Sequence, residues 1–351
     1  MQHRTLENVG RSPTLVVEVL GVNVSLAALL AVVGLVGCGS GVATQSPSAI
    51  TSVGAHTSPS HSWMDPTAKA ENLLYVSTFP FQGNPDVEVF SWGKRTLVGT
   101  LTGFDSPQHL CADKAGNVFI PDGGASQILE YAHGGTSPIA TLHDTGHTPR
   151  ACSADGVTGD LAVIDSGTGT GDVAIYRNAS GNPTRHINTH FTTYEFCGYD
   201  DAGNLFVDGT NHLEHFLFAE IPKGSRFLTD VNLGGHVLKP GSVQWDGKYM
   251  AVGDEVGNMV YQFTIFGSTG TLQGRTDLDG GEGPVRQFWI PKFAKGIVNP
   301  QGRHLVAAQF HFSRFDAGDV GYWGYPGGGA AEHLIVGPDH PVGVTVSIST
   351  K

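Results

Sequence analysis

Acidic and imidazole side chains recur where short β-rich runs of this sequence end. Four such runs end in an aspartate, at Asp122, Asp165, Asp208 and Asp254. The segments between repeated units carry histidines, of which the candidate ligand-binding residues are His147, His190, His236 and His340. Carboxylates suit calcium and imidazoles suit zinc. If these side chains converge, they could hold a divalent cation that orients a substrate or activates water.

A structural role is open for the same residues. An aspartate at a strand end commonly accepts hydrogen bonds from the N–H groups of its own turn, and histidines in loops are often simply solvated. No catalytic motif accompanies them: the chain has no G-x-S-x-G, H-E-x-x-H, EF-hand or P-loop pattern. The sequence therefore offers candidate ligands and identifies no catalytic residue.

The elements that must position these side chains belong to a repeat. A turn of the type Gly-Asn-Leu-Phe recurs six times, once without its glycine, and its second position falls at Asn72, Asn117, Asp160, Asn204, Lys248 and Arg303. The spacings are 45, 43, 44, 44 and 55 residues, and all but the last lie in the range of propeller blades. The longest repeat, the sixth, predicts an outsized loop, and Trp323 within it is a further candidate for the ligand-binding face.

Each repeat reads as four short strands separated by Gly, Asn and Asp turns. The third strand of each ends in an aromatic residue that we expect to pack in the core. The first repeat lacks a first strand, and the C-terminal run 341–347 has the pattern of that missing strand. We therefore predict an all-β fold, a six-bladed β-propeller of four-stranded antiparallel blades, in which the C-terminal strand completes the first blade and leaves no open edge.

The repeated turns also carry a resemblance. The D-x-x-G-N-[VL]-F type turns at 113–119 and 201–206 and the Pro-x-Gly-Val-x-Val ending resemble the NHL and TolB-like six-bladed propellers, and a group of uncharacterised secreted bacterial lipoproteins. The resemblance covers roughly residues 70–350. It implies the fold, and it implies no single function, because propellers host lyases, lactonases, dehydrogenases and pure scaffolds.

The N-terminal segment predicts export. Residues 26–36 form an apolar run that ends in Leu35-Val36-Gly37-Cys38, which resembles a bacterial lipobox with Cys38 as the lipidated residue. The positive charges at Arg4 and Arg11 lie far from the apolar run, so a retained anchor is the alternative to cleavage. We expect a signal peptide at 1–38, a flexible tether at 39–68 and a propeller at 69–351, exposed at the cell envelope or secreted.

Three cysteines remain in the expected domain, Cys111, Cys152 and Cys197. Three cannot all pair. They occupy equivalent places in successive first strands, which favours a small apolar core position repeated by blade. The absence of a C-x-x-C pair leaves a zinc site on these cysteines unsupported.

Charge narrows the choice of partners. The formal net charge is −12, and such a surface repels the phosphate backbone of nucleic acids. Two functions remain. The first is a binding or scaffold propeller for a small molecule, glycan or protein. The second is a metal-assisted hydrolase or lyase, similar to gluconolactonase-like and streptogramin-lyase-like propellers, with calcium or zinc as the cofactor. In both we expect a monomer whose ligand lies on the face that holds the strand two–three loops and the loops between blades.

Overall fold

The computed structural model describes residues 50–52, 60–80, 82–167, 169, 171–281, 283–292, 303–310 and 318–350, with only the backbone at 50–52. The predicted signal peptide and its Cys38 lie outside the described residues, as does most of the predicted tether. Among the residues described, no helix is long and apolar enough to cross a membrane.

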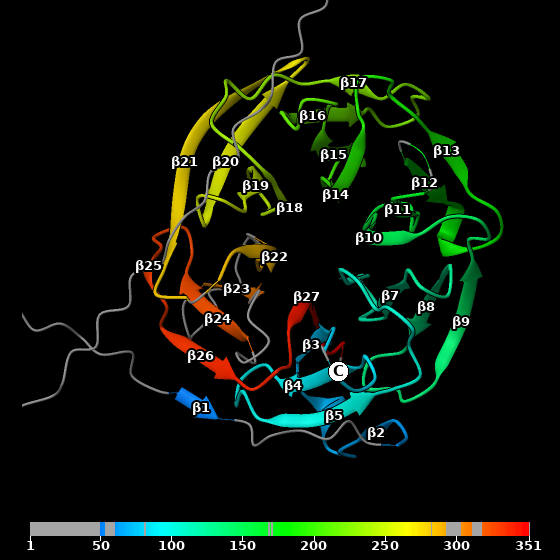
Figure 1. The fold of residues 1–351 in the computed structure, drawn as a ribbon, viewed down its shortest axis with the longest axis vertical. Coiled ribbons are helices and arrows are strands. Elements are labelled where there is room, and N and C mark those ends of the chain that lie inside the picture. Colours follow the sequence, from blue (N-terminus) through cyan, green and yellow to red (C-terminus); the bar gives the residue numbers. More distant parts are fainter. Residues whose placement is uncertain are drawn as a thin grey trace, which may run out of the picture. The chain divides into compact units, whose positions relative to one another are not determined.

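Six sheets, each built on four antiparallel strands, are arranged around a central axis, with the first strand of each sheet innermost (Figure 1). The first sheet contains β27 (Pro341–Ser347), β3 (Leu73–Thr78), β4 (Val87–Ser91), β5 (Leu97–Leu101) and β2 (Trp63–Met64). The second contains β6 (Cys111–Ala112), β7 (Val118–Asp122), β8 (Gln127–Tyr131) and β9 (Pro138–His143). The third contains β10 (Pro149–Ala154), β11 (Leu161–Asp165), β12 (Asp172–Tyr176) and β13 (Thr184–His186).

The remaining three sheets repeat this order. The fourth contains β14 (Thr193–Tyr199), β15 (Leu205–Thr210), β16 (Phe216–Ile221) and β17 (Thr229–Asp230). The fifth contains β18 (Pro240–Trp245), β19 (Met250–Asp254), β20 (Met259–Phe266), β21 (Thr269–Asp279) and the short β25 (Gly329–Ala330). The sixth contains β22 (Val285–Trp289), β23 (His304–Gln309), β24 (Asp319–Gly324), β26 (His333–Val336) and β1 (Ile50–Ser52). The predicted six-bladed β-propeller of four-stranded antiparallel blades is confirmed.

The last described strand completes the first blade. Strand β27 pairs antiparallel with β3, with Val344 opposite Val76 and Val346 opposite Leu74. Two short strands fall within the range expected to be a tether: β1 pairs with the outer strand β26, and β2 pairs with the outer strand β5. An outer strand presents unpaired backbone N–H and C=O groups, and a passing segment can satisfy them.

The repeated turns fold for a local reason. In the second blade, one carboxylate oxygen of Asp113 accepts the N–H groups of Ala115 and Asn117, while the Asn117 amide donates to the other oxygen. Between them, Gly116 has φ +86°, which costs a residue without Cβ little. Asp200 makes the same contacts in the fourth blade. The Asp-x-x-Gly-Asn spacing is therefore a turn signal that needs no tertiary contact.

Buried aliphatic and aromatic side chains fill the space between blades. Second strands are buried along their whole length, as in β7, β11 and β19, because they lie between the inner and outer strands and between neighbouring blades. The third-strand aromatics Phe90, Tyr131, Tyr176 and Phe263 are at most 3% exposed. They pack in the core as expected.

The pairing of two cysteines differs from what the sequence predicted. We expected a repeated unpaired core position, whereas Cys111 and Cys152 form a disulfide with a Cα–Cα distance of 5.6 Å. The reason is tertiary: β6 and β10 are the innermost strands of neighbouring blades and contact each other, so equivalent positions lie side by side. Cys197 remains a buried free thiol, and burial raises its pKa.

Candidate functional site

The four strand-end aspartates do not share one site. Asp122 accepts the N–H groups of Asp105 and Ser106, at 3.1 and 2.6 Å from the nearer carboxylate oxygen. Asp208 accepts the N–H of Phe196 at 2.8 Å. Asp254 accepts the N–H groups of Leu238, Lys239 and Val256, each at 3.2 Å. Asp122 and Asp208 hold the polypeptide that enters or forms the first strand of their own blade, and Asp254 holds such a segment and the turn that follows it. Among these contacts, the one from Val256 to Asp254 is the predicted bond within the aspartate's own turn.

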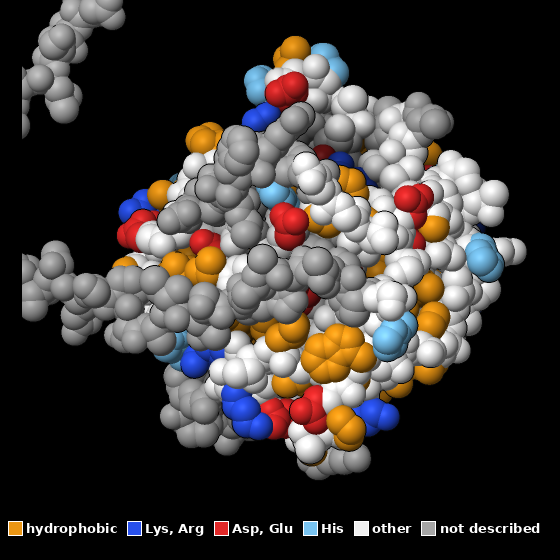
Figure 2. Space-filling view, turned by 60° about the horizontal axis from the view of Figure 1, so that its bottom comes forward, with side chains coloured by type: hydrophobic (Ala, Val, Ile, Leu, Met, Phe, Trp, Pro, Cys, Tyr) orange, Lys and Arg blue, Asp and Glu red, His pale blue; other side chains and the backbone are white. Residues whose placement is uncertain are grey.

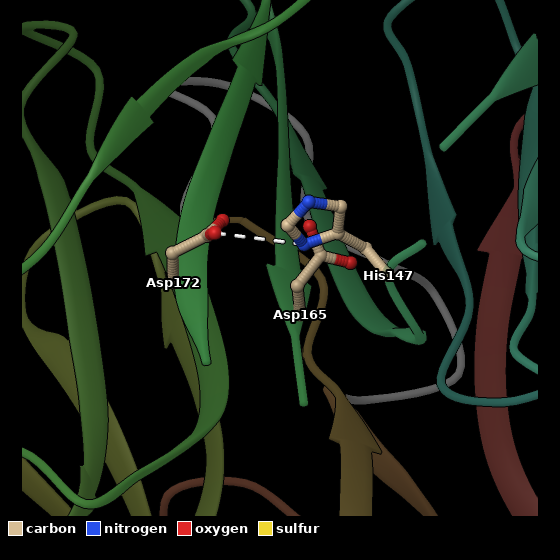
Figure 3. Close-up of side chains that lie close together, drawn as sticks. All are labelled: His147, Asp165 and Asp172. Atoms are coloured by element: carbon tan, nitrogen blue, oxygen red, sulfur yellow. Dashed lines mark ion pairs between the residues drawn. The ribbon is translucent and has the colours of Figure 1, made fainter. Parts of the chain in front are cut away.

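The fourth aspartate, Asp165, belongs to a group that includes one predicted histidine. His147, Asp165 and Asp172 each offer one ligand atom, and these atoms lie within 4.8 Å of one another. Figure 3 shows the three side chains pointing toward one another, from the loop before β10 and from the facing ends of β11 and β12. His147 Nδ1 lies 3.6 Å from Asp172 Oδ2. Within the described part of the chain, no other three acidic, histidine or cysteine side chains are grouped this closely.

An arginine already occupies the centre of this group. Arg185 Nη1 donates to Asp165 and Asp172, both at 2.7 Å, and to His147 Nδ1 at 3.1 Å, while Nη2 pairs with Asp144. A guanidinium only donates, so His147 Nδ1 is an acceptor here. Burial lowers the pKa of Arg185, but the surrounding carboxylates raise it more. Burial and Asp144 raise the pKa of Asp165. A metal ion could use these ligands only after Arg185 moved away.

The other predicted ligand residues lie apart from this group. His190 is exposed and pairs with Asp230, and His236 is exposed beside the ring of Tyr261, with centroids 6.1 Å apart. His340 is 2% exposed and bonds to Asp339. Trp323 corrects the expectation of a ligand contact: it is fully buried in β24, and its indole N–H donates to the Asp279 carbonyl at 2.9 Å. Trp323 was a candidate because it lies in the longest repeat, but its position in β24 places it in the core.

The first strands enclose a wide cavity along the central axis. Its volume is about 1050 Å³, and it opens toward the turns that join first and second strands. Its lining includes the half-buried indoles of Trp92, Trp245 and Trp289 and the rings of Phe196, Tyr199 and Phe288. Trp92 and Trp289 meet edge to face, with centroids 5.3 Å apart. On the face drawn in Figure 2, exposed hydrophobic side chains form small groups interrupted by polar and charged ones.

Polar side chains in the wall of this cavity are largely bound to the protein itself. Gln287 Nε2 donates to the Leu110 carbonyl, and its Oε1 accepts the N–H groups of Leu110 and Val344. Gln244 bonds in the same way to the N–H and the carbonyl of Ile290. These amides link the first-strand segments of different blades by hydrogen bonds. The surface that they leave for a ligand is mainly aromatic and aliphatic.

A second, smaller cavity lies at the opposite end of the channel. It has a volume of about 320 Å³ and is lined by the beginnings of first strands and by the loops after second strands. We call it the polar mouth, defined by His109, Arg150, Glu195, Glu255 and Arg286. It lies on the face where the sequence predicted a ligand, yet none of the residues predicted there lines it.

Irregular pairing directs these side chains into the mouth. The register between first and second strands shifts between Pro149 and Ala151 and again between Val285 and Phe288, so that Arg150 and Arg286 fall at the irregularities. Glu195 falls at a third one, in β14. Bulges turn side chains away from the regular alternation and are frequent beside functional sites. A charged residue near the start of three first strands, β10, β14 and β22, was the available signal, but alternation alone does not tell whether it faces the channel.

Comparisons with known proteins indicate the fold and no family. No family model matches the sequence, and no curated protein matches it. The chain is similar to a protein of unknown function from Bacteroides caccae, with a TM-score of 0.57 and 12% identity over 79% of this chain and 99% of that chain. It is also similar to a chain in a crystal structure of a nidogen/laminin complex, with a TM-score of 0.59 and 12% identity over 80% of this chain and 99% of that chain. Likeness at this identity concerns the fold alone.

Proposed function

We propose that this protein is a binding propeller that takes an apolar small molecule into the wide end of its central channel. The observation that carries the proposal is the cavity of about 1050 Å³ with three tryptophans in its wall. Pockets that bury small ligands are concave, mostly apolar and of this order of size. Because aromatic rings are prominent in the lining, and because Gln244 and Gln287 already have partners in the protein, we expect an apolar ligand to fit better than a glycan.

The proposal includes the setting of the propeller. The apolar run and the lipobox-like segment ending at Cys38 support export and attachment to the cell envelope. The repeated turns support a relationship with NHL and TolB-like propellers. The first blade is completed by β27 of the same chain, which supports a monomer. A net charge of −12 argues against nucleic acid as the partner.

The test is binding of the uncharged apolar dye N-phenyl-1-naphthylamine, followed by its fluorescence on excitation of tryptophan. We expect the purified protein to bind the dye and Ala112→Trp, which fills the cavity from β6, to weaken binding roughly tenfold or more. Ala202→Trp is the matched control, because Ala202 is exposed and lies outside the cavity lining. Absence of dye binding, or equal binding by the two variants, would contradict the proposal.

The metal-assisted hydrolase or lyase remains a second candidate because of the group formed by His147, Asp165 and Asp172. Its ligand set combines an imidazole with carboxylates, which suits zinc better than calcium. Metal content measured by mass spectrometry, with and without Asp172→Asn, separates the two candidates. A stoichiometric ion that the variant loses would favour the enzyme, and a metal-free protein with an intact dye site would favour binding.

A further inference from the structure

One buried nitrogen in the polar mouth has no partner. His109 is 2% exposed, and its Nδ1 lies 3.1 Å from the Arg150 carbonyl oxygen. A carbonyl only accepts, so Nδ1 carries the proton, and in the neutral ring Nε2 is then a bare acceptor. Burial, then the charges of Arg150 and Arg286, hold the pKa of His109 well below its usual range. His109 lines the mouth, and its buried Nε2 has no hydrogen-bond partner within the described residues.

Balanced charges surround this nitrogen. Arg150 Nη1 lies 3.0 Å from Glu195 Oε2, and Arg286 Nε lies 3.0 Å from Glu255 Oε1. All four side chains are between about a fifth and a third exposed, so each pair is open to the cavity. Farther out, Lys239 pairs with Glu214 at 3.1 Å. Each guanidinium has five donors and each carboxylate about four acceptor sites, so a pair can take a third group without breaking.

We propose that the polar mouth binds a small zwitterion of the amino-acid type. Its carboxylate joins the guanidinium groups of Arg150 and Arg286. Its ammonium joins the carboxylates of Glu195 and Glu255 and donates one hydrogen bond to His109 Nε2. This site is separate from the apolar cavity and does not depend on the function proposed for it.

The charged side chains of the polar mouth favour a zwitterion over other small ligands. A simple anion would meet two glutamates and leave His109 Nε2 without a donor. A simple cation would meet two arginines. A neutral sugar could donate to Nε2 but would make no use of the two open ion pairs. A ligand with both charges can contact the arginines and the glutamates together, and its ammonium supplies the donor that His109 Nε2 lacks.

The probes are L-alanine and L-alanyl-L-alanine, with N-acetyl-L-alanyl-L-alanine and L-alanyl-L-alaninamide as forms that lack one charge. Binding to the full protein is measured by calorimetry, and the His109 ring nitrogens are followed by ¹⁵N NMR. We expect at least one zwitterion to bind, and each blocked dipeptide to bind roughly tenfold or more weakly. The resonance of Nε2 should move while Nδ1 stays protonated. Binding of alanine identifies a free amino acid as the ligand type, and binding of the dipeptide alone identifies a short peptide.

Two variants of His109 separate the hydrogen bond from the fold. His109→Asn keeps a donor near the Arg150 carbonyl and deletes Nε2, whereas His109→Phe keeps the ring beside Phe196, whose centroid is 4.5 Å away. We expect both to weaken binding of the zwitterion roughly tenfold. His236→Phe is the control, because His236 is exposed and outside the mouth. Equal binding of a blocked dipeptide, no binding of any probe, or binding that leaves the Nε2 resonance unchanged would overturn the proposal.

Discussion

At the residue scale, a buried carboxylate sets a pH dependence. Glu88 in β4 is 4% exposed, and its Oε2 has no hydrogen-bond partner among the described residues. Burial, then the charges of Asp86 and Asp339, raise the pKa of Glu88 from 4.5 to about 8. Between these two values the folded state binds more protons than the unfolded state, so this residue makes the free energy of unfolding fall as the pH rises.

We therefore expect Glu88→Gln to stabilise the protein above pH 8 and to have little effect below pH 4.5. Glu88 contributes a slope of roughly 1.4 kcal/mol per pH unit between these limits, and the uncharged amide removes it. Urea unfolding at pH 5 and pH 8 measures the difference. Glu214→Gln is the control, because the Glu214 side chain is 81% exposed. An equal effect of Glu88→Gln at both pH values would show that its ionisation is not the cause.

Residue types were easier to predict than their surroundings. The strand-end aspartates were visible in the sequence, and so was a bond to the turn that follows, which Asp254 makes to Val256. The bonds from Ser106 to Asp122 and from Leu238 to Asp254, both from the preceding loop, were not predicted. Arg185 was not predicted to fill the space between His147 and Asp165, because it comes from a different strand, β13. Contacts between side chains of different strands depend on register, which a pattern of residue types does not specify.

At the element scale, one disulfide joins two blades. Cys111 and Cys152 link β6 to β10 across a sequence separation of 41 residues. Closing a loop of this length stabilises a fold by about 3 to 4 kcal/mol in the chain-entropy account. We expect the double variant Cys111→Ala/Cys152→Ala to lose roughly that much unfolding free energy, as measured by denaturant unfolding.

Treatment with a reductant shows whether this stability comes from the disulfide bond or from the packing of the two cysteine side chains. Dithiothreitol should lower the unfolding midpoint of the wild type and leave that of the double variant unchanged. Cys197→Ala is the control: Cys197 is a free buried thiol, so this variant should keep the response to reductant. If the wild-type midpoint were the same with and without reductant, the two thiols would not be paired.

Regular elements could be predicted because their signals are local. The Asp113 and Asp200 turns form within five residues, and their recurrence gave the number of blades. The bulges that aim Arg150 and Arg286 into the mouth could not be predicted, because each exists only relative to its partner strand. The same limit applies to the disulfide. The sequence could therefore predict the scaffold, and the polar mouth became visible only with the register.

At the scale of the whole molecule, the ring depends on its last strand. Every residue of β27 is buried, and Val344 and Val346 pack in one cluster with Leu74 and Val76 of β3. The strand also contacts the neighbouring blades, since the Val344 N–H donates to Gln287 Oε1 at 2.8 Å. Without β27, the inner edge of β3 and the channel side of the first blade would be open.

We expect deletion of residues 341–351 to abolish cooperative unfolding and to cause aggregation, because it exposes an unpaired inner strand and apolar side chains together. Deletion of 349–351 is the matched control, since it leaves β27 whole. Circular dichroism during thermal unfolding and size-exclusion chromatography measure the effect. A synthetic peptide of residues 341–351, added in trans, should restore the missing strand and a cooperative transition. A truncated chain that unfolds at the wild-type midpoint without the peptide would show that the ring does not need β27.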